Sequence, residues 1–433
     1  MDPYAEVLRR GFDEFGRFIN PMIAQRAALA GEPIRVTRAA GGMLLDADGR
    51  EIEDLHGTQA LGHRNPQVAA ALREFLESDA PSWYPSRVSP FAGRLARRLC
   101  ERTGYDLAYF ACTGSDIVEA SLKLARALTR RPRILCLEGG YHGCTYGSVA
   151  MMGVGPMHDP FGPHLPGVER VPFGDVEAFR KAMGEDVGAV VVEPIQGEAG
   201  VRVLPEAFVA ALCESTAAHG ALLVADEAQT ALGRTGRAFL RSESWPRRPD
   251  VVLIAKTLGG GLVPVSAMLT RKELFLRAYG RDFSDGEAHN TTFSYHSLGA
   301  VAGLATLELL TDGLIGRVRE GGALFRRELE ARLAGSPLFV EVRGEGYMVG
   351  IKLRQPDHPW LTFEHFGYPQ LAGQSVVAPL VCHRLYRRGF FAFSCGHDWS
   401  VLRLQPRFEI PFEKLTALAK AIREELDYLD RLT

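Results

Sequence analysis

A lysine stands where a buried strand would end, in the stretch VVLIAKTLGGG at residues 251–261. The apolar run before it is typical of a strand covered on both faces, and three glycines follow Lys256 closely. Removing an ammonium group from water without a partner is unfavourable by several kcal/mol. Lys256 therefore either reaches solvent or takes part in chemistry, and an amine at a desolvated site can attack a carbonyl carbon to form a Schiff base.

Two adjacent carboxylates end a second apolar run, in LLVADEAQTALGRTG. They are Asp226 and Glu227, and Gln229 lies three residues beyond Asp226. Such a pair could hold magnesium, could pair with a cationic group of a ligand, or could stabilise the start of a helix. A magnesium-dependent nucleotide hydrolase should also carry GxxxxGK[ST], which this sequence lacks, so the magnesium interpretation is the weaker one.

Two turns could contact a phosphorylated aromatic ligand. In ACTGSDIVEASLKLAR, Gly114 and Ser115 stand where a strand gives way to a helix, so their N–H groups and the Ser115 hydroxyl could bind a phosphate. The same residues also suit an ordinary helix cap. Tyr141, in GGYHG, could stack on a ring or could be a packed turn residue.

One ligand uses a phosphate site, a carboxylate and a lysine together. Pyridoxal 5′-phosphate carries a phosphate, a ring nitrogen and an aldehyde, and each of these groups finds a partner among the three motifs. None of the motifs is specific alone, but their combination favours a pyridoxal phosphate enzyme. A non-catalytic protein that binds a phosphorylated ligand is the alternative from another class.

The elements that must position these residues follow from the pattern between residues 107 and 270. Strand-length apolar runs alternate there with helical stretches, which indicates a mainly parallel sheet covered by helices on both faces. Such sheets bind ligands at the carboxyl ends of their strands, where the reactive residues stand. The runs are LAYFAC, RILCLEG, GAVVVEP, ALLVADE, VVLIAK and PVSAMLT.

The two ends of the chain predict a second, smaller α+β unit. An amphipathic helix ending near Asn20-Pro21 and a hairpin at the DADG turn come first, and strands with a final amphipathic helix close the chain. We therefore divide the chain into an N-terminal segment (residues 1–65), a large cofactor-binding domain (66–314) and a C-terminal small domain (315–433). The irregular stretch 355–376 could border a site.

Composition excludes several other classes. The 433 residues carry a formal net charge of −2, so no overall field would attract nucleic acid or an anionic membrane. No run approaches the roughly 20 apolar residues of a membrane span, and the start of the chain does not read as a secretory signal. The seven cysteines are scattered without a CxxC pair, which argues against a disulfide framework and a zinc site. We expect a cytoplasmic protein without a metal.

Taken together, the motifs resemble those of the class III aminotransferases, which are pyridoxal phosphate enzymes of fold type I. The resemblance implies a large domain with a mostly parallel, seven-stranded type of sheet flanked by helices. The resemblance covers nearly the whole chain, and the order and spacing of the motifs make it specific. The segments that carry it are GHRNP (62–66), TGSDIVEASLKLAR (113–126), YHG (141–143), EPIQGEAGV (193–201), DEAQTALGRTG (226–236), AKTLGGGLVPVSA (255–267), HNTTF (289–293) and RLQP (403–406).

The resemblance assigns a role to each candidate residue. Lys256 would form the Schiff base and move the proton, Asp226 would pair with the ring nitrogen, and Gln229 would reach the phenolic oxygen. The remaining cofactor contacts would be Gly114 and Ser115 at the phosphate, Tyr141 over the ring, the adjacent His142, Glu193 behind Asp226, and Thr291 and Thr292. Thr292 would reach the cofactor of a neighbouring subunit, which implies a homodimer with composite sites.

The resemblance also implies how two substrates share one site. Arg403 would bind the carboxylate of glutamate or 2-oxoglutarate, and Glu198 would pair with Arg403 when the other substrate lacks that carboxylate. A surface arginine and a loop acid are the alternative interpretation. Arg407 stands where the family has a small apolar residue, so it could join Arg403.

The expected reaction is transfer of an amino group between an amine or ω-amino donor and a 2-oxo acid by a ping-pong mechanism. The partners would be small-molecule amine and oxo-acid substrates. A decarboxylase, racemase or aminomutase using the same lysine is the alternative within the fold.

Overall fold

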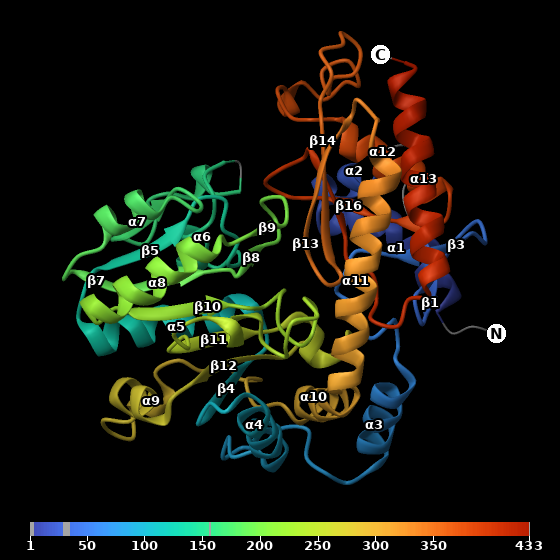
Figure 1. Cartoon of the computed structure of the whole chain (residues 1–433). Helices are drawn as coiled ribbons and strands as arrows, with labels where there is room; N and C mark the ends of the chain where they lie inside the picture. Colours follow the sequence, from blue (N-terminus) through green and yellow to red (C-terminus); the bar gives the residue numbers. More distant parts are fainter. Residues whose placement is uncertain (1–3, 29–34, 156, 433) are drawn as a thin grey trace.

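A seven-stranded sheet forms the centre of the larger part of the molecule (Figure 1). The structure is a computed structural model that describes residues 4–28, 35–155 and 157–432. All strands run in one direction except β12, which is antiparallel to both of its neighbours, so the predicted mainly parallel sheet is confirmed. The order is β4 (Leu107–Ala111), β12 (Ser266–Thr270), β11 (Val251–Ile254), β10 (Leu222–Asp226), β7 (Val187–Val192), β5 (Arg133–Leu137) and β6 (Val168–Val171).

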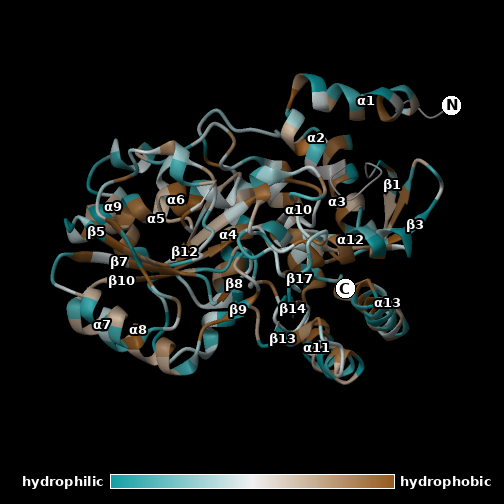
Figure 2. Ribbon diagram, turned by 90° about the horizontal axis from the view of Figure 1, so that it is seen from above, coloured by the Kyte–Doolittle hydropathy of each residue, from teal (hydrophilic) through white to brown (hydrophobic). Residues whose placement is uncertain are grey.

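Helices cover both faces of this sheet because its strands are apolar on both sides. Val224 and Leu253 pack with helix α5, whereas their neighbours Leu223 and Val252 belong to the core on the opposite face. Figure 2 shows the brown, hydrophobic strands between these helical layers. The helices of this part are α3 (Pro66–Glu77), α4 (Pro90–Thr103), α5 (Gly114–Thr129), α6 (Tyr146–Ala150), α7 (Val176–Ala182), α8 (Glu206–His219), α9 (Lys272–Tyr279) and α10 (Ser297–Leu309).

The C-terminal part contains a four-stranded sheet flanked by long helices. The sheet order is β13 (Phe339–Glu345), β14 (Met348–Leu353), β17 (Val401–Leu404) and β16 (Phe393–Ser394). Helices α11 (Asp312–Leu333) and α13 (Phe412–Asp430) pack against each other, and α12 (Val377–Arg387) packs on α13. The irregular stretch predicted at 355–376 contains only a short 3₁₀ turn, η5 (Pro369–Leu371).

The N-terminal segment joins this C-terminal part through a second four-stranded sheet. Its hairpin strands are β1 (Val36–Ala40), β2 (Met43–Asp46) and β3 (Glu51–Asp54), with the predicted DADG turn between β2 and β3. The C-terminal strand β15 (Phe390–Phe391) pairs with β3 in parallel. The predicted first helix is present as α1 (Ala5–Phe18), followed by α2 (Pro21–Ala28).

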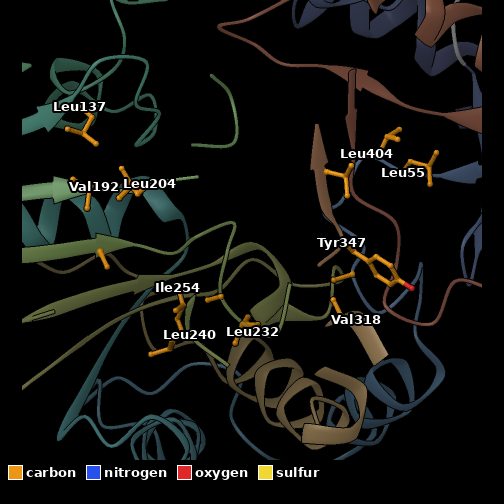
Figure 3. Close-up of a cluster of buried hydrophobic side chains, with 14 of the residues drawn as sticks. Leu55, Leu137, Val192, Leu204, Leu232, Leu240, Ile254, Val318, Tyr347 and Leu404 are labelled. Atoms are coloured by element: carbon orange, nitrogen blue, oxygen red, sulfur yellow. The ribbon is translucent and has the colours of Figure 1, made fainter. Parts of the chain in front are cut away.

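One hydrophobic cluster continues from the large sheet into the C-terminal part. Figure 3 shows Ile254 and Leu240 beside the sheet, and Tyr347 and Leu404 in the C-terminal part. Continuous packing of this kind fixes the two parts relative to each other, and so fixes the groups that meet between them. Within the described residues, no single helix has the length and apolar character to cross a membrane, and α10 with α11 would do so only as a pair bent by 69°.

Candidate active site

The backbone at Lys256 turns its side chain out of the sheet. The four residues of β11 are buried, Ala255 has φ −153° and ψ −145°, and Lys256 itself has a positive φ of 44°. A left-handed conformation is unfavourable for a lysine and is typical of functional sites. Lys256 opens a short 3₁₀ helix, η3 (Lys256–Gly259), and its side chain is exposed to a cavity instead of being packed in the core.

The cavity has a volume of about 460 Å³ and lies at the carboxyl ends of β4, β7, β10 and β11. These are the ends at which the alternating pattern of strands and helices predicts ligand binding. Most of the predicted site residues line it together, although they come from segments far apart in the sequence: Gly114, Ser115, Tyr141, His142, Glu193, Glu198, Asp226, Gln229 and Lys256.

The surroundings of Lys256 favour its neutral amine. Burial within the protein is the largest cause that lowers the pKa of Lys256, and the nearby Arg403 lowers it further. The carboxylates of Glu198 and Asp226 oppose this effect without reversing it. A lysine with a lowered pKa loses its proton more readily, which a nucleophile and a base both require.

The turn before α5 caps the helix and also lines the cavity. Thr113 caps the helix by accepting a hydrogen bond from the Asp116 N–H, and the Asp116 carboxylate accepts one from the Thr113 N–H. This capping box leaves the first helical N–H groups, those of Gly114 and Ser115, for a ligand at the cavity wall. Gly143 keeps the wall open, because a Cβ there would lie 2.1 Å from the Ser115 Oγ.

Asp226 lies in the cavity wall with a histidine behind it. The Asp226 Oδ2 is 2.8 Å from the Nδ1 of the buried His142, and the Asp226 Oδ1 accepts a hydrogen bond from the Ala228 N–H. Burial lowers the pKa of His142, but the hydrogen bond and charge of Asp226 raise it further than burial lowers it. The Asp226 carboxylate faces the cavity with His142 hydrogen-bonded behind it, and a ligand's protonated ring nitrogen would find a counter-charge there.

Glu227 points away from Asp226 into the protein. Its carboxylate accepts hydrogen bonds from the N–H groups of Arg241 and Ser242 and from the Thr230 hydroxyl. The two adjacent acids consequently do not converge on one point, and Glu227 stabilises the loop that follows β10. The magnesium interpretation of these two carboxylates is wrong for this reason.

Glu193 lines the cavity and holds two backbone segments beside it. Its carboxylate accepts hydrogen bonds from the N–H groups of Tyr141 at 2.9 Å and Gly197 at 3.3 Å, so it fixes the turn that carries the Tyr141 ring. Burial raises the pKa of Glu193 to about 7, and the neighbouring Asp226 adds to this rise. The side chain therefore changes charge close to neutral pH.

A second cavity of about 290 Å³ adjoins the first and shares Thr58, Tyr141, Glu198, Gln229 and Lys256 with it. Arg403 enters from β17, and Glu198 enters from the loop between the short strands β8 (Ile195–Gln196) and β9 (Arg202–Val203). The Arg403 Nη1 donates to the Glu198 carboxylate, which also accepts from the Gly396 N–H at 3.0 Å. Burial alone would raise the pKa of Glu198, but Arg403 lowers it to about 2, so the two form an ion pair.

Three further predicted site residues, Arg407, Thr291 and Thr292, lie outside both cavities. Arg407 does not line either cavity; its Nε is 3.4 Å from the buried Glu53, and it donates to the backbone carbonyl of Glu409. Arg407 therefore does not join Arg403 in this structure. Thr291 and Thr292 line a separate small hollow with Trp83, so this chain does not bring them to its own Lys256 cavity.

Several residues that line the second cavity were not predicted as site residues from the sequence. They are His56, Thr58, Met157, Phe393 and Gln405. His56, Thr58, Met157 and Phe393 stand outside the motifs quoted above, and Gln405 lies within RLQP but was given no role. They reach the cavity through the packing of the N- and C-terminal segments against the large sheet.

Comparisons with known proteins agree with this geometry. A family model described as aminotransferase class-III matches residues 26–426. An acetylornithine aminotransferase from Streptomyces coelicolor is 40% identical over 330 residues, which are 74% of this chain and 78% of that protein. The aminotransferase PigE from Serratia is 34% identical over 79% of this chain, although the match spans only 41% of that longer protein.

The fold also matches solved structures. The crystal structure of an ornithine aminotransferase from Toxoplasma gondii superposes with a TM-score of 0.84 at 24% sequence identity, covering 98% of this chain and 96% of that one. The expected fold type I architecture is therefore confirmed.

Replacing Glu193 with Gln should change how the stability of the cofactor-free protein depends on pH. The folded chain raises the pKa of Glu193 from 4.5 to about 7, so its contribution to stability is present below pH 4.5 and is lost as the pH rises through 7. The free energy of unfolding of the wild type, relative to Glu193→Gln, should fall by about 3 kcal/mol over this window. Urea titrations between about pH 5 and pH 8 measure this difference. A difference that stays constant with pH would contradict the assignment.

Proposed function

The chain belongs to the class III aminotransferases, and we propose that it transfers an amino group between glutamate or 2-oxoglutarate and a second, amine-bearing substrate at the Lys256 cavity. Enzymes of this family use pyridoxal 5′-phosphate. The observation that carries the proposal is the position of the Lys256 amine, with its lowered pKa, in the same cavity as Asp226 and the open start of α5.

The cavity fits the three polar groups of that cofactor. Gly114 and Ser115 at the start of α5 would hold its phosphate, Asp226 would hold its ring nitrogen, and Lys256 would meet its aldehyde. Tyr141, held at its backbone by Glu193, would cover the ring. When bound, the cofactor supplies an aldehyde that condenses with amines and a ring that withdraws electrons from the substrate carbon.

We assign the proton transfers to the Nζ of Lys256. An amine whose pKa is lowered by burial can take a proton from the substrate carbon. It would deliver that proton to the carbon that the cofactor's aldehyde supplies, which lies on the other side of the nitrogen between them. Asp226 would support this step without moving the proton itself, because a carboxylate beside the ring nitrogen would keep that nitrogen protonated. His142 holds Asp226 in place and stabilises that charge.

The Glu198–Arg403 pair would allow one site to accept two different substrates. While the amine substrate is bound, Glu198 neutralises Arg403 and avoids a buried, unpaired cation. When glutamate or 2-oxoglutarate enters, its carboxylate would replace that of Glu198 on the Arg403 guanidinium. A decarboxylase, racemase or aminomutase needs no such exchange of partners, so this pair favours transfer.

The second substrate would carry its amino group on a flexible chain. Relatives named for acetylornithine and ornithine, which are 40% and 32% identical to this chain, support an amino-acid-derived amine. The wall of the second cavity is mixed, with Met157 and Phe393 as apolar groups and His56 and Thr58 as polar ones. This composition suits an aliphatic substrate with a polar end.

A homodimer would complete each site. The Trp83 Nε1 donates to the Thr292 carbonyl at 2.7 Å. Val88 and Phe293, which adjoin residues of the same hollow in the sequence, have exposed apolar side chains, and such groups favour an interface. Thr292 could then reach the phosphate of the partner's cofactor. A cytoplasmic location stays a prediction from composition.

Replacing Lys256 with Ala should leave a folded protein that still takes up the cofactor but does not complete a transfer. The loss of the only amine assigned to proton transfer should lower turnover by about a thousandfold or more. Conversion of glutamate to 2-oxoglutarate measures turnover, and Lys181→Ala, on an exposed lysine of α7, is the control. Near-normal turnover of Lys256→Ala would refute the proposal.

Replacing Arg403 with Ala should weaken the glutamate half-reaction by about a hundredfold, because a charge-assisted contact to the carboxylate is lost. The amine half-reaction should change much less, since that substrate does not use the guanidinium. Single-turnover absorbance measurements separate the two halves, and Arg407→Ala, whose side chain faces Glu53, is the matched control. Equal losses in both halves would show that the carboxylate site is misplaced.

Replacing Thr292 with Ala should raise the Kd of the cofactor about tenfold, although this side chain is outside its own chain's Lys256 cavity. The reason is that Thr292 would bind the phosphate in the partner subunit. Absorbance titration measures the affinity, and sedimentation measures the assembly state. A monomeric wild type, or an unchanged Kd in the variant, would rule out the composite site.

A further inference from the structure

The side chain of Gln405 lines the second cavity, and its Nε2 has no hydrogen-bond partner in the part of the chain that the structure describes. Gln405 follows β17 directly and is two residues from Arg403, and residues at that spacing on an extended chain project to the same side. Both side chains line the 290 Å³ cavity. Gln405 is only 3% exposed, and its Nε2 finds no acceptor among the described residues.

The position of this carboxamide is fixed by its surroundings. The Gln405 N–H donates to the Leu55 carbonyl at 2.8 Å, and the carbonyl of the next residue, Pro406, accepts from the Arg234 guanidinium. The side chain packs over Gly57, where an added Cβ would come within 2.3 Å of the Gln405 Oε1. The missing partner is therefore not the result of a loose side chain.

A buried amide without a partner is unfavourable by about 1–3 kcal/mol, and most buried polar groups in native proteins are satisfied. Arg403 shows the same feature, because its Nε is also buried without an acceptor in the described part of the chain. Two residues of one cavity thus offer donors that no group of the described residues accepts from. A ligand with several acceptor atoms would satisfy both.

The charges around the cavity favour an anionic ligand. Glu198 neutralises Arg403, but in the described residues Arg234 donates only to the carbonyls of Gly57, Tyr347 and Pro406. Burial lowers the pKa of Arg234 to about 9, and the charge of Asp54 offsets only part of this fall. A carboxylate would add a negative charge beside Arg234, and each of its two oxygens accepts more than one hydrogen bond.

We propose that Gln405 determines specificity for the dicarboxylate substrate by donating a hydrogen bond to the carboxylate that Arg403 binds once Glu198 has moved away. This inference rests on the proposed function and adds a second, uncharged hydrogen-bond donor to the carboxylate site. It predicts that Gln405 acts in the half-reaction of glutamate and not in that of the amine, because in the latter Glu198 occupies Arg403.

Binding of glutarate to the cofactor-loaded enzyme tests this role without turnover. Glutarate carries two carboxylates but neither an amino nor an oxo group, and calorimetry gives its Kd. Gln405→Leu should weaken glutarate binding about tenfold, and Gln405→Glu should weaken it more, because it keeps the shape of the side chain but adds a negative charge. Gln370→Leu, on an exposed glutamine of η5, should bind glutarate as the wild type does.

Single half-reactions give the second readout. In Gln405→Leu, KM for glutamate should rise about tenfold with little change in kcat, and the amine half-reaction should stay within about twofold of the wild type. Thermal melting of each variant checks folding, and the nearly isosteric Gln405→Glu keeps the test valid if Gln405→Leu does not fold.

Unchanged glutarate affinity in folded Gln405 variants would overturn the inference, and so would a loss confined to the amine half-reaction. These outcomes differ from failure of the proposed function. That function fails if the wild type does not convert glutamate to 2-oxoglutarate, whereas the inference alone fails if the wild type does so and the Gln405 variants bind glutarate normally.

Discussion

The amine of Lys256 must be both buried and reactive, and the rest of the structure serves this requirement. A charged lysine inside a protein is unfavourable, so the pKa of Lys256 falls and the neutral amine becomes accessible. The left-handed backbone at this residue directs the side chain into the cavity and away from the core. The cavity around it has separate regions of opposite charge. They are formed by Asp226 with His142, by the start of α5 and by the Glu198–Arg403 pair.

The parallel sheet explains why these regions lie together. Asp226 ends β10, Lys256 follows β11 and the start of α5 follows β4, and strands that run in the same direction bring these ends to one edge. The packing between the large sheet and the C-terminal part then adds a second wall. Arg234 connects the two, because its guanidinium reaches from the loop after β10 to the carbonyls of Gly57, Tyr347 and Pro406.

Sequence alone predicts the part of the site that depends on strand ends. Lys256, Asp226 and Ser115 follow apolar runs, and alternation of strands and helices places such positions at one edge whatever the rest of the chain does. The edge strand β6 was not predicted, because its residues VERV are only partly buried and lack an apolar run. Only the family resemblance singled out Asp226 from Glu227, because the strand pattern alone does not show that these adjacent side chains point to different sides.

The residues that line the second cavity could not be predicted in the same way. His56 and Gln405 stand 349 positions apart and meet only because the N-terminal hairpin and β17 pack together. Arg407 illustrates the converse, because a cation next to a recognised motif is directed elsewhere by Glu53, a buried acid on β3. Side chains whose position depends on long-range packing carry no local signal, whereas those at strand ends do.

Reduction of the cofactor-loaded enzyme with borohydride, followed by peptide mapping, tests most directly whether the Lys256 amine is the reactive group. The structure predicts that the yellow colour is lost and that the reduced cofactor stays attached to the peptide containing Lys256. Attachment to another lysine, or release of all cofactor after reduction and unfolding, would contradict the central role of this amine.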